Sequence, residues 1–265
     1  MTITLIVTTY NWEKALELLL MSVLSQTRMP DQFIVADDGS REDTRELIDE
    51  FVSRFDIPVL HVWHKDDGFQ RSVILNQAIG KATGDYIIQV DGDVILHRCF
   101  VEDHEFFAAP GYFIRGHRIR LSKEYSKQVF DQKSIVFNDT FKGLLQVFKT
   151  ARMRWVSTVF RLDLRRHAEV YGCNLSYWRS DAVAVNGYNE DISGWGCEDQ
   201  EFVARMTFTG VKRRKIRFAA KQYHLYHPEA SQDRLSTNHA ILANTISTRS
   251  TSCKNGIEKY QTPHL

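Results

Sequence analysis

The sequence of 265 residues lacks the features that define several large classes of protein. It contains no run of about 18 apolar residues, so no transmembrane helix is expected. It opens without a basic segment followed by an apolar stretch, so no signal peptide is expected either. Its net charge of +1 differs from the strongly basic balance of a dedicated nucleic-acid binder. We therefore expect a cytoplasmic protein with no nucleic-acid partner.

Two kinds of binding site are also missing. The four cysteines match no zinc-ligand spacing, and without an export signal they are expected to be free thiols: Cys99, Cys173, Cys197 and Cys253. The sequence has no G-x-x-x-x-G-K-[ST] loop, and no G-x-G-x-x-G follows the first predicted strand. These absences argue against an ATPase and a dehydrogenase. Any phosphates would therefore be held by a metal ion and by scattered side chains.

The N-terminal half alternates short apolar strands with amphipathic helices. Strands are expected at 3–7, 33–36, 59–63 and 86–90, with a helix after each of the first three. Ser40 and Asp43 predict a capping box at the start of the second helix. Short units in this order predict an α/β fold, with a mostly parallel central sheet and helices on both faces.

Polar residues follow each of these strands. The four clusters lie at 8–12, 37–40, 65–71 and 91–93. In a parallel sheet, ligands bind at the carboxyl ends of the strands, near the point where the strand order reverses. Four polar clusters at one edge are much less expected by chance than any one of them, so they predict a shared binding site.

Asp91 and Asp93 come directly after the fourth strand, with Gly92 between them. Burying two unpaired carboxylates would be costly, so these two are expected to face a cleft and share a cation. Oxygen ligands at this spacing suit Mg²⁺ or Mn²⁺, ions that commonly carry a diphosphate. The alternative is a turn with two solvated aspartates.

Other residues at the strand ends suit a nucleotide. Thr8 would hydrogen-bond a base and Tyr10 would stack on it, or Tyr10 is a half-buried loop aromatic. Asp38 would accept the imide N–H of a uracil, or it forms an Asx-turn or a helix cap. Arg71 would contact a phosphate or a base carbonyl, or it is a solvated residue at the start of a helix.

The C-terminal half places acidic residues beside an aromatic one. Two glycines flank Trp195, and Glu198 and Asp199 follow at the start of an amphipathic helix. The helix dipole favours a carboxylate in a first turn, which is one explanation of either acid. The other is a sugar site, which needs a flat apolar face and acceptors for hydroxyl groups.

Two further stretches allow more than one interpretation, and a third has one expected structure. His224 and His227 are either metal ligands through neutral imidazole or a hydrogen-bonded surface pair. The basic and aromatic stretch 141–167 is an acceptor-binding insertion, a helix on an anionic membrane, or one or two amphipathic helices on the sheet. The charged run 212–215 is expected to be a solvated edge ahead of a strand at 216–220.

Taken in order, these stretches resemble the family 2 nucleotide-sugar glycosyltransferases with the GT-A fold. The matching segments are TTYNW, ADDGS, HKDDGFQR, VDGD, GCN, GWGCEDQEF and HLYHP, which begin at Thr8, Ala36, His64, Val90, Gly172, Gly194 and His224. The resemblance covers about 3–228. It points to a bacterial branch that is similar to a chondroitin-polymerase catalytic domain and has a galactosyltransferase-type C-terminal motif.

The resemblance implies a Rossmann-like GT-A catalytic domain over 1–228 and a C-terminal helical extension over 229–265. It divides the domain into a nucleotide-binding half, 1–97, and an acceptor and catalytic half, 98–228, with a basic insertion at about 122–170.

The resemblance also implies a role for each matching residue. Four residues would bind or help to bind the uridine of a UDP-sugar: Thr8, Tyr10, Asp38 and Arg71. Asp91 would contact the ribose or the metal ion. Three residues would hold Mn²⁺ or Mg²⁺: Asp93, with His224 and His227 as further ligands. Two would line the sugar and acceptor pocket, Trp195 and Glu198, and Asp199 would be the general base.

The implied function is an inverting, metal-dependent transfer of a sugar from a UDP-sugar to a saccharide or glycolipid acceptor. The setting would be bacterial surface polysaccharide or lipo-oligosaccharide synthesis, with or without a peripheral contact at the anionic inner face of the membrane. One alternative is a sugar-nucleotide nucleotidyltransferase, which usually has a glycine-rich basic loop where this chain has TTYNW. A non-catalytic carbohydrate-binding protein is the other, and the joint presence of Asp93, Asp199 and both histidines argues against it.

Overall fold

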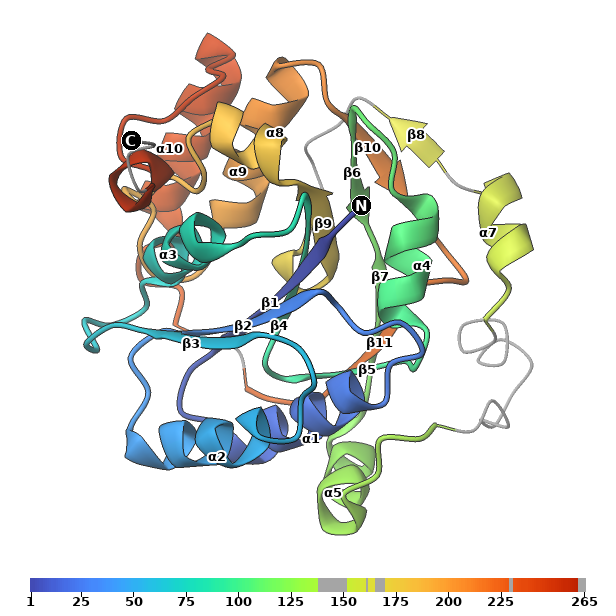
Figure 1. Ribbon diagram of the computed structural model, residues 1–265. Coiled ribbons are helices and arrows are strands. Elements are labelled where there is room, and N and C mark those ends of the chain that lie inside the picture. Colours follow the sequence, from blue (N-terminus) through green and yellow to red (C-terminus); the bar gives the residue numbers. More distant parts are fainter. Residues whose placement is uncertain (138–151, 161, 165–169, 229–230, 262–265) are drawn as a thin grey trace.

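The computed structural model describes residues 1–137, 152–160, 162–164, 170–228 and 231–261. In this part of the chain a large twisted sheet is covered by helices on both faces, and a smaller sheet lies beside it (Figure 1).

Eight described strands form the large sheet, in the order β3-β2-β1-β4-β9-β6-β10-β8. Their bounds are β1 Ile3–Thr9, β2 Gln32–Asp37, β3 Val59–Trp63, β4 Tyr86–Asp91, β6 Tyr112–Arg115, β8 Leu162–Leu164, β9 Leu175–Trp178 and β10 Lys212–Lys215. Strands β3, β2, β1 and β4 run parallel to one another, and β6 is parallel to β10. Among the described strands of this sheet, β9 is antiparallel to β4 and β6, and β8 is antiparallel to β10. The predicted mostly parallel sheet is therefore confirmed, and β1, β2 and β4 end at one edge.

The smaller sheet has the described order β5-β11-β7, with β5 Val94–Leu96, β7 His117–Arg120 and β11 Lys221–His224. β11 is antiparallel to β5 and parallel to β7. The Leu225 N–H, just past β11, donates to the Asp93 carbonyl at 2.9 Å. This sheet therefore carries the end of β11 to the turn that follows β4.

Helices cover both faces of the large sheet with their apolar sides. Their bounds are α1 Glu13–Leu24, α2 Glu42–Val52, α3 Arg71–Lys81, α4 Phe100–Phe107, α5 Lys123–Gln132, α7 Arg154–Phe160, α8 Arg179–Ala184, α9 Glu198–Phe208 and α10 Leu235–Thr248. Leu5 and Val7 of β1 belong to the core formed with α1, α2 and α4, while Ile6 belongs to the core formed with α3 and α9. Alternate side chains of one strand thus anchor both helical layers.

The end of the chain packs back onto the catalytic half expected from the sequence. Helix α10 lies against α9, and the Thr245 hydroxyl donates to Glu201 of α9 at 3.0 Å. A short 3₁₀ helix, Ile257–Tyr260, follows and buries Ile257 in the core formed with α3. The last part of the chain therefore supports the helix that begins at Glu198.

Two sequence predictions are wrong. The capping box does not form, because α2 starts after Arg41 and the Ser40 hydroxyl instead accepts from the Asn11 N–H at 2.9 Å. The charged run Lys212–Lys215 is the strand β10 itself, between β6 and β8, and the segment 216–220 is not a strand. Arg214 is buried there because its guanidinium lies over the Tyr112 ring at 4.2 Å and donates to the Phe107 carbonyl at 2.8 Å.

Much of the basic stretch 141–167 lies outside the described residues, including Arg165 and Arg166. In the described part, Arg152 forms an ion pair with Asp103 at 2.6 Å, and Arg154 forms one with Glu102 at 2.7 Å. These two charges are therefore largely compensated within the protein. No described helix combines the length and the apolar character needed to cross a bilayer.

Candidate functional site

The carboxyl ends of β1 and β4 are joined by a side-chain contact. Thr8 and Asp91 are register partners, and the Thr8 hydroxyl donates to Asp91 Oδ1 at 3.1 Å. The Gly92 N–H donates to the Thr8 carbonyl at 2.7 Å, and a Cβ at Gly92 would lie 2.9 Å from that oxygen. A residue without a side chain therefore lets the chain turn between Asp91 and Asp93.

The residues expected to bind uridine gather on the loops after β1, β2 and β3. Asp38 is buried, accepts from the Gln70 N–H at 2.9 Å and lies 2.8 Å from His64 Nε2. Burial raises the pKa of Asp38 in spite of these contacts. Tyr10 is 49% exposed, and its hydroxyl donates to Asp66 at 3.0 Å, a hydrogen bond that raises the pKa of Tyr10. The Tyr10 ring is accessible, whereas both oxygens of Asp38 are engaged.

Asp93 faces two histidines, one at the end of β11 and one just after it. Its Oδ2 lies 3.1 Å from His227 Nε2 and 3.6 Å from His224 Nε2. One ligand atom from each of the three residues lies within 4.8 Å of the others. The other oxygen, Asp93 Oδ1, is buried and has no hydrogen-bond partner among the described residues. The spacing is that of a small metal site.

Backbone contacts fix the tautomer of both histidines. Nδ1 of His224 lies 2.9 Å from the Leu225 carbonyl, and Nδ1 of His227 lies 2.6 Å from the Pro228 carbonyl. A carbonyl only accepts, so Nδ1 carries the hydrogen and Nε2 of a neutral ring presents a lone pair. Two lone pairs next to a carboxylate require a cation, either a proton or a metal ion. The hydrogen bond to Asp93 correspondingly raises the pKa of His227.

A second acidic cluster surrounds the guanidinium of Arg71 at the start of α3. Its Nη2 lies 2.7 Å from Asp91, and its Nη1 lies 3.0 Å from Asp199 and 3.3 Å from Glu198. Burial alone would lower the pKa of Arg71, but the three carboxylates raise it well above its ordinary value. Burial would also raise the pKa of Asp91, and the Arg71 charge lowers it instead. Arg71 therefore joins the acids after β4 to those of α9.

Asp199 is held by three donors. Its Oδ1 accepts from Arg71 at 3.0 Å and from the Tyr188 hydroxyl at 3.1 Å, and its Oδ2 accepts from the Gly172 N–H at 2.8 Å. A Cβ at Gly172 would lie 2.3 Å from Asp199 Oδ1 and 2.5 Å from Arg71 Nη2. Only glycine fits this position, which explains the first residue of the GCN segment.

Glu198 is the more weakly held of the two adjacent acids. One oxygen faces Arg71, and the other accepts from the Gly196 N–H at 3.1 Å. Burial, reinforced by the charge of Asp199, raises the pKa of Glu198 to about 7. Glu198 is thus a buried carboxyl group that takes up a proton near neutral pH.

Trp195 is 43% exposed on the loop that leads into α9. Gly194, Gly196 and Cys197 all have positive φ, and at +76° Cys197 adopts a conformation that favours glycine. The buried amide of Asn238, on α10, donates to the carbonyls of Ser193 and Gly196 at 3.0 and 3.1 Å. The C-terminal helix therefore fixes the loop that presents the Trp195 ring.

The structure thus gathers many of the predicted residues into an Asp93 cluster, an Arg71 cluster and a third group around Asp38. The Arg71 guanidinium contacts three carboxylates. Its charge also acts on Asp38 and opposes the rise in the pKa of that carboxyl. Sequence reasoning missed Tyr188, Asn238 and the function of Gly172. The NGYN turn that contains Tyr188 indicated only a loop, and no local signal marked Asn238.

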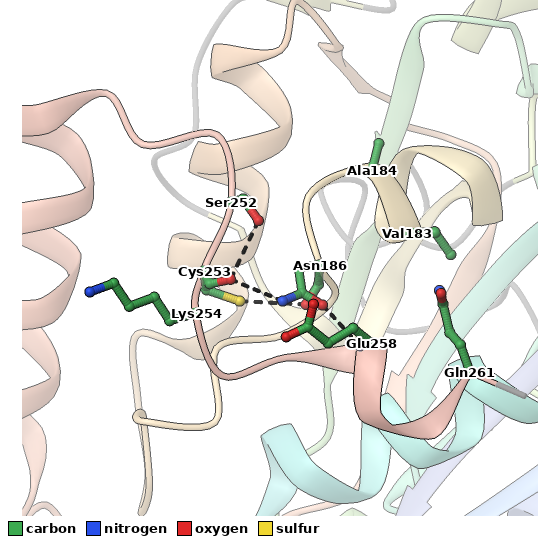
Figure 2. Close-up of a pocket in the computed structure, with 8 residues that line it drawn as sticks. All are labelled: Val183, Ala184, Asn186, Ser252, Cys253, Lys254, Glu258 and Gln261. Carbon is green, nitrogen blue, oxygen red and sulfur yellow. Dashed lines mark hydrogen bonds between the residues drawn. The ribbon is translucent and has the colours of Figure 1, made fainter. Parts of the chain in front are cut away.

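A separate hollow of about 540 Å³ lies where the loop after α8 meets the C-terminal segment (Figure 2). Its lining residues are Val183, Ala184, Asn186, Ser252, Cys253, Lys254, Glu258 and Gln261. In Figure 2 the Cys253 thiol points at Asn186, whose carbonyl accepts from it at 3.4 Å. None of the predicted site residues lines this hollow, so it is not the candidate site.

Family models match both halves of the chain. The model described as "Glycosyl transferase family 2" matches residues 4–145, and the one described as "N-terminal domain of galactosyltransferase" matches 153–228. The chain is 27% identical over 249 residues to chondroitin synthase of Escherichia coli, covering 85% of this chain and 35% of that protein. It is 28% identical to hyaluronan synthase of Pasteurella multocida, covering 77% of this chain and 22% of that protein. The chain therefore spans about a third or less of these relatives.

Solved structures share the fold at low sequence identity. TarS 1–349 of S. aureus matches with a TM-score of 0.65 and 16% identity, over 98% of this chain and 68% of that one. The same fragment has been solved with UDP and with UDP-GlcNAc. The mannosyltransferase PcManGT of Pyrobaculum calidifontis, in complex with GDP-Man and Mn²⁺, matches with a TM-score of 0.61 and 17% identity, over 92% of this chain and 64% of that one.

Proposed function

This chain belongs to glycosyl transferase family 2, and from that premise we propose that it is an inverting, metal-dependent enzyme that uses a UDP-sugar. The acceptor would be a saccharide or a glycolipid. The relatives named as chondroitin and hyaluronan synthases support a role in building a bacterial surface polysaccharide or lipo-oligosaccharide.

One observation carries the proposal. Arg71 bridges Asp91, after β4, to Asp199, in the first turn of α9, with contacts of 2.7 and 3.0 Å. This bridge supports assigning the early aspartates and the late acidic pair to one site. A donor held near the first pair and an acceptor near the second would meet there.

Asp93, His224 and His227 would hold the metal ion. The donor set of one carboxylate and two imidazoles suits Mn²⁺ better than Mg²⁺, which prefers oxygen ligands. When bound, the ion supplies positive charge that stabilises the leaving diphosphate. Thr8, Tyr10 and Asp38 would bind the uridine, and Arg71, whose charge acts on Asp38, would help.

Asp199 would remove the proton from the attacking hydroxyl of the acceptor. A sugar hydroxyl is a poor nucleophile until its proton is taken. Tyr188, Gly172 and Arg71 would hold the carboxylate in one orientation for this step. Attack opposite the nucleotide, with one base and one displacement, inverts the anomeric centre without a covalent intermediate. Trp195 would offer an apolar face to a sugar ring, and Glu198 would contact its hydroxyl groups.

The experiment is a UDP-release assay with Mn²⁺ across several UDP-sugars and saccharide acceptors. We expect acceptor-dependent UDP release with at least one donor, and a product whose anomeric configuration, read by NMR, is opposite to that of the donor. Pyrophosphate release from UTP and a sugar phosphate would indicate a nucleotidyltransferase instead. Binding of saccharide without turnover of any nucleotide sugar would indicate a carbohydrate-binding protein.

A further inference from the structure

An aromatic and basic cluster adjoins the candidate base and has no part in the mechanism above. Tyr171 directly precedes Gly172, whose N–H donates to Asp199 at 2.8 Å, and the Tyr171 side chain is 42% exposed. The guanidinium of Arg118 lies 4.6 Å from the centre of the Tyr171 ring, and that of Arg115 lies 5.1 Å from it. The ring thus positions a cation beside the acceptor side of the site.

Unlike Arg71, Arg118 has no carboxylate partner among the residues that the structure describes. Within the described chain its contacts are the Tyr171 ring and the Cys173 sulfur, 3.8 Å from Nη1. Arg71, by contrast, contacts three carboxylates. A partly buried guanidinium held by stacking and without an anion is preorganised to bind one, because little side-chain freedom is lost on binding.

The register of the smaller sheet directs Arg118 toward the site. Arg120 pairs with His224, and Arg118, two residues earlier, lies on the same side of β7. Ile119, between them, packs into the apolar cluster formed with α1 and α5. The Arg118 side chain therefore lies on the side of the sheet that carries the metal-site histidine.

We propose that Arg118 binds an anionic group of the acceptor sugar, a carboxylate or a phosphate, and that Tyr171 is its positioning residue. This inference rests on the proposed function and names its acceptor class. We assign Arg118 to the acceptor side because it contacts Tyr171 and Cys173, the two neighbours of Gly172, whose N–H binds Asp199. The counter-charge for the donor diphosphate would instead be the metal ion held by Asp93, His224 and His227.

The test compares three acceptors that share one scaffold: p-nitrophenyl β-glucuronide, p-nitrophenyl β-glucoside 6-phosphate and the neutral p-nitrophenyl β-glucoside. Binding is measured by ligand-observed NMR and transfer by UDP release. We expect the wild type to prefer one or both anionic acceptors. Arg118→Gln should weaken that binding and raise the matching KM about 10- to 100-fold, the usual effect of losing a charge-assisted hydrogen bond. Values for the neutral glucoside and the Kd for UDP should stay within about twofold.

Two matched variants complete the test. Arg45→Gln removes an equal charge from an exposed position on α2 and should leave all three acceptors unchanged. Tyr171→Ala should raise the KM for the anionic acceptors, and Tyr171→Phe, which keeps the ring, should restore it. For both Tyr171 variants, the KM for the neutral glucoside is measured as the reference.

The binding measurement separates this inference from the proposed function. If no UDP-sugar is turned over but the wild type still binds the anionic glycosides through Arg118, only the proposed function fails. Equal binding of charged and neutral glycosides by the wild type would overturn the inference. A weaker Kd for UDP in Arg118→Gln, with acceptor binding unchanged, would also overturn it, by assigning Arg118 to the donor diphosphate.

Discussion

Asp91 and Asp93 are two residues apart, yet they lie in clusters of opposite design. Asp91 shares the guanidinium of Arg71 with Glu198 and Asp199. Asp93 faces two imidazoles whose Nδ1 hydrogens are already given to backbone carbonyls. The first cluster contains its own permanent cation. The second has no permanent cation among its three residues, so a bound proton or metal ion has to supply the positive charge.

In the Arg71 cluster the compensating positive charge is permanent, whereas in the Asp93 cluster it can bind and dissociate. A buried carboxylate needs a compensating charge, and a covalently attached guanidinium supplies it at all times. Carboxylates in the Arg71 cluster are therefore oriented before any substrate arrives. The Asp93 cluster is complete only when a cation is present. We expect changes in the first cluster to act on the chemical step, and changes in the second to act through the metal ion.

The largest effect is expected for Asp199→Asn in the Arg71 cluster. The amide cannot accept the proton of the acceptor hydroxyl, so the transfer rate should fall about 10²- to 10⁴-fold. UDP affinity, measured by calorimetry, should stay nearly unchanged because the residue lies on the acceptor side. Asp181→Asn, the same exchange at a half-buried position on α8, should retain the wild-type rate. A large loss of UDP binding in Asp199→Asn would make Asp199 a donor ligand.

Asp93→Asn should lower transfer about 100-fold at moderate Mn²⁺, because the metal ion loses its only anionic ligand within the described trio. Titration with Mn²⁺ sharpens the comparison. Added Mn²⁺ should restore much of the rate of Asp93→Asn and none of the rate of Asp199→Asn. Equal responses of the two variants to Mn²⁺ would contradict the assignment of metal binding to the Asp93 cluster and of the chemical step to the Arg71 cluster.

The parts of the fold that could be predicted are those that leave a local pattern in the sequence. The family, the α/β class and the mostly parallel sheet are confirmed. Strands β1, β2 and β4 each contain a short run of apolar residues, and they bury every residue or nearly every one. Strand β10 was not predicted, since its sequence is KRRK. Arg214 is accommodated there by the Tyr112 ring and the Phe107 carbonyl, partners about 100 residues away that no local pattern reveals.

The site was predicted unevenly for a similar reason. Sequence motifs identified the acids and histidines that the structure gathers, but their pairing depends on contacts between distant segments. Arg71 and Asp199 are 128 positions apart, and Tyr188 reaches Asp199 from a turn with no distinctive composition. The predicted roles of the individual residues remain predictions. Residue types reveal candidate chemistry, while the choice of partner depends on tertiary packing.

A smaller effect, on stability, is expected from Glu198. Its pKa is raised from 4.5 to about 7, so between these pH values the folded chain holds a proton that the unfolded chain has lost. The free energy of unfolding should therefore decrease as pH rises through this window, by up to about 3 kcal/mol from this group. Glu198→Gln should remove that decrease. Urea unfolding at pH 5 and pH 7.5 measures it, with Glu46→Gln, an exposed change on α2, as the control.

An unchanged pH dependence in Glu198→Gln would contradict this assignment. It would mean that Glu198 is ionised throughout, with Arg71 compensating both acids of α9 equally. The Arg71 cluster would then hold three fixed carboxylates in place of two fixed ones and one that takes up a proton.

The smallest effect is expected at Cys197, where the loop carrying Trp195 enters α9. The residue has φ of +76°, a conformation that costs a side chain roughly 1 kcal/mol and costs glycine nothing. Cys197→Gly should leave the transfer rate within about twofold, because the hydrogen-bonding partner of the thiol is His239, at 3.5 Å, which is not one of the site residues. Stability should change by no more than about 1 kcal/mol, since relief of the strain offsets the lost packing. Cys197→Val should be clearly less stable, because a β-branched residue fits this backbone worst. If valine were tolerated as well as glycine, the left-handed turn would not be what presents Glu198 and Asp199 to Arg71.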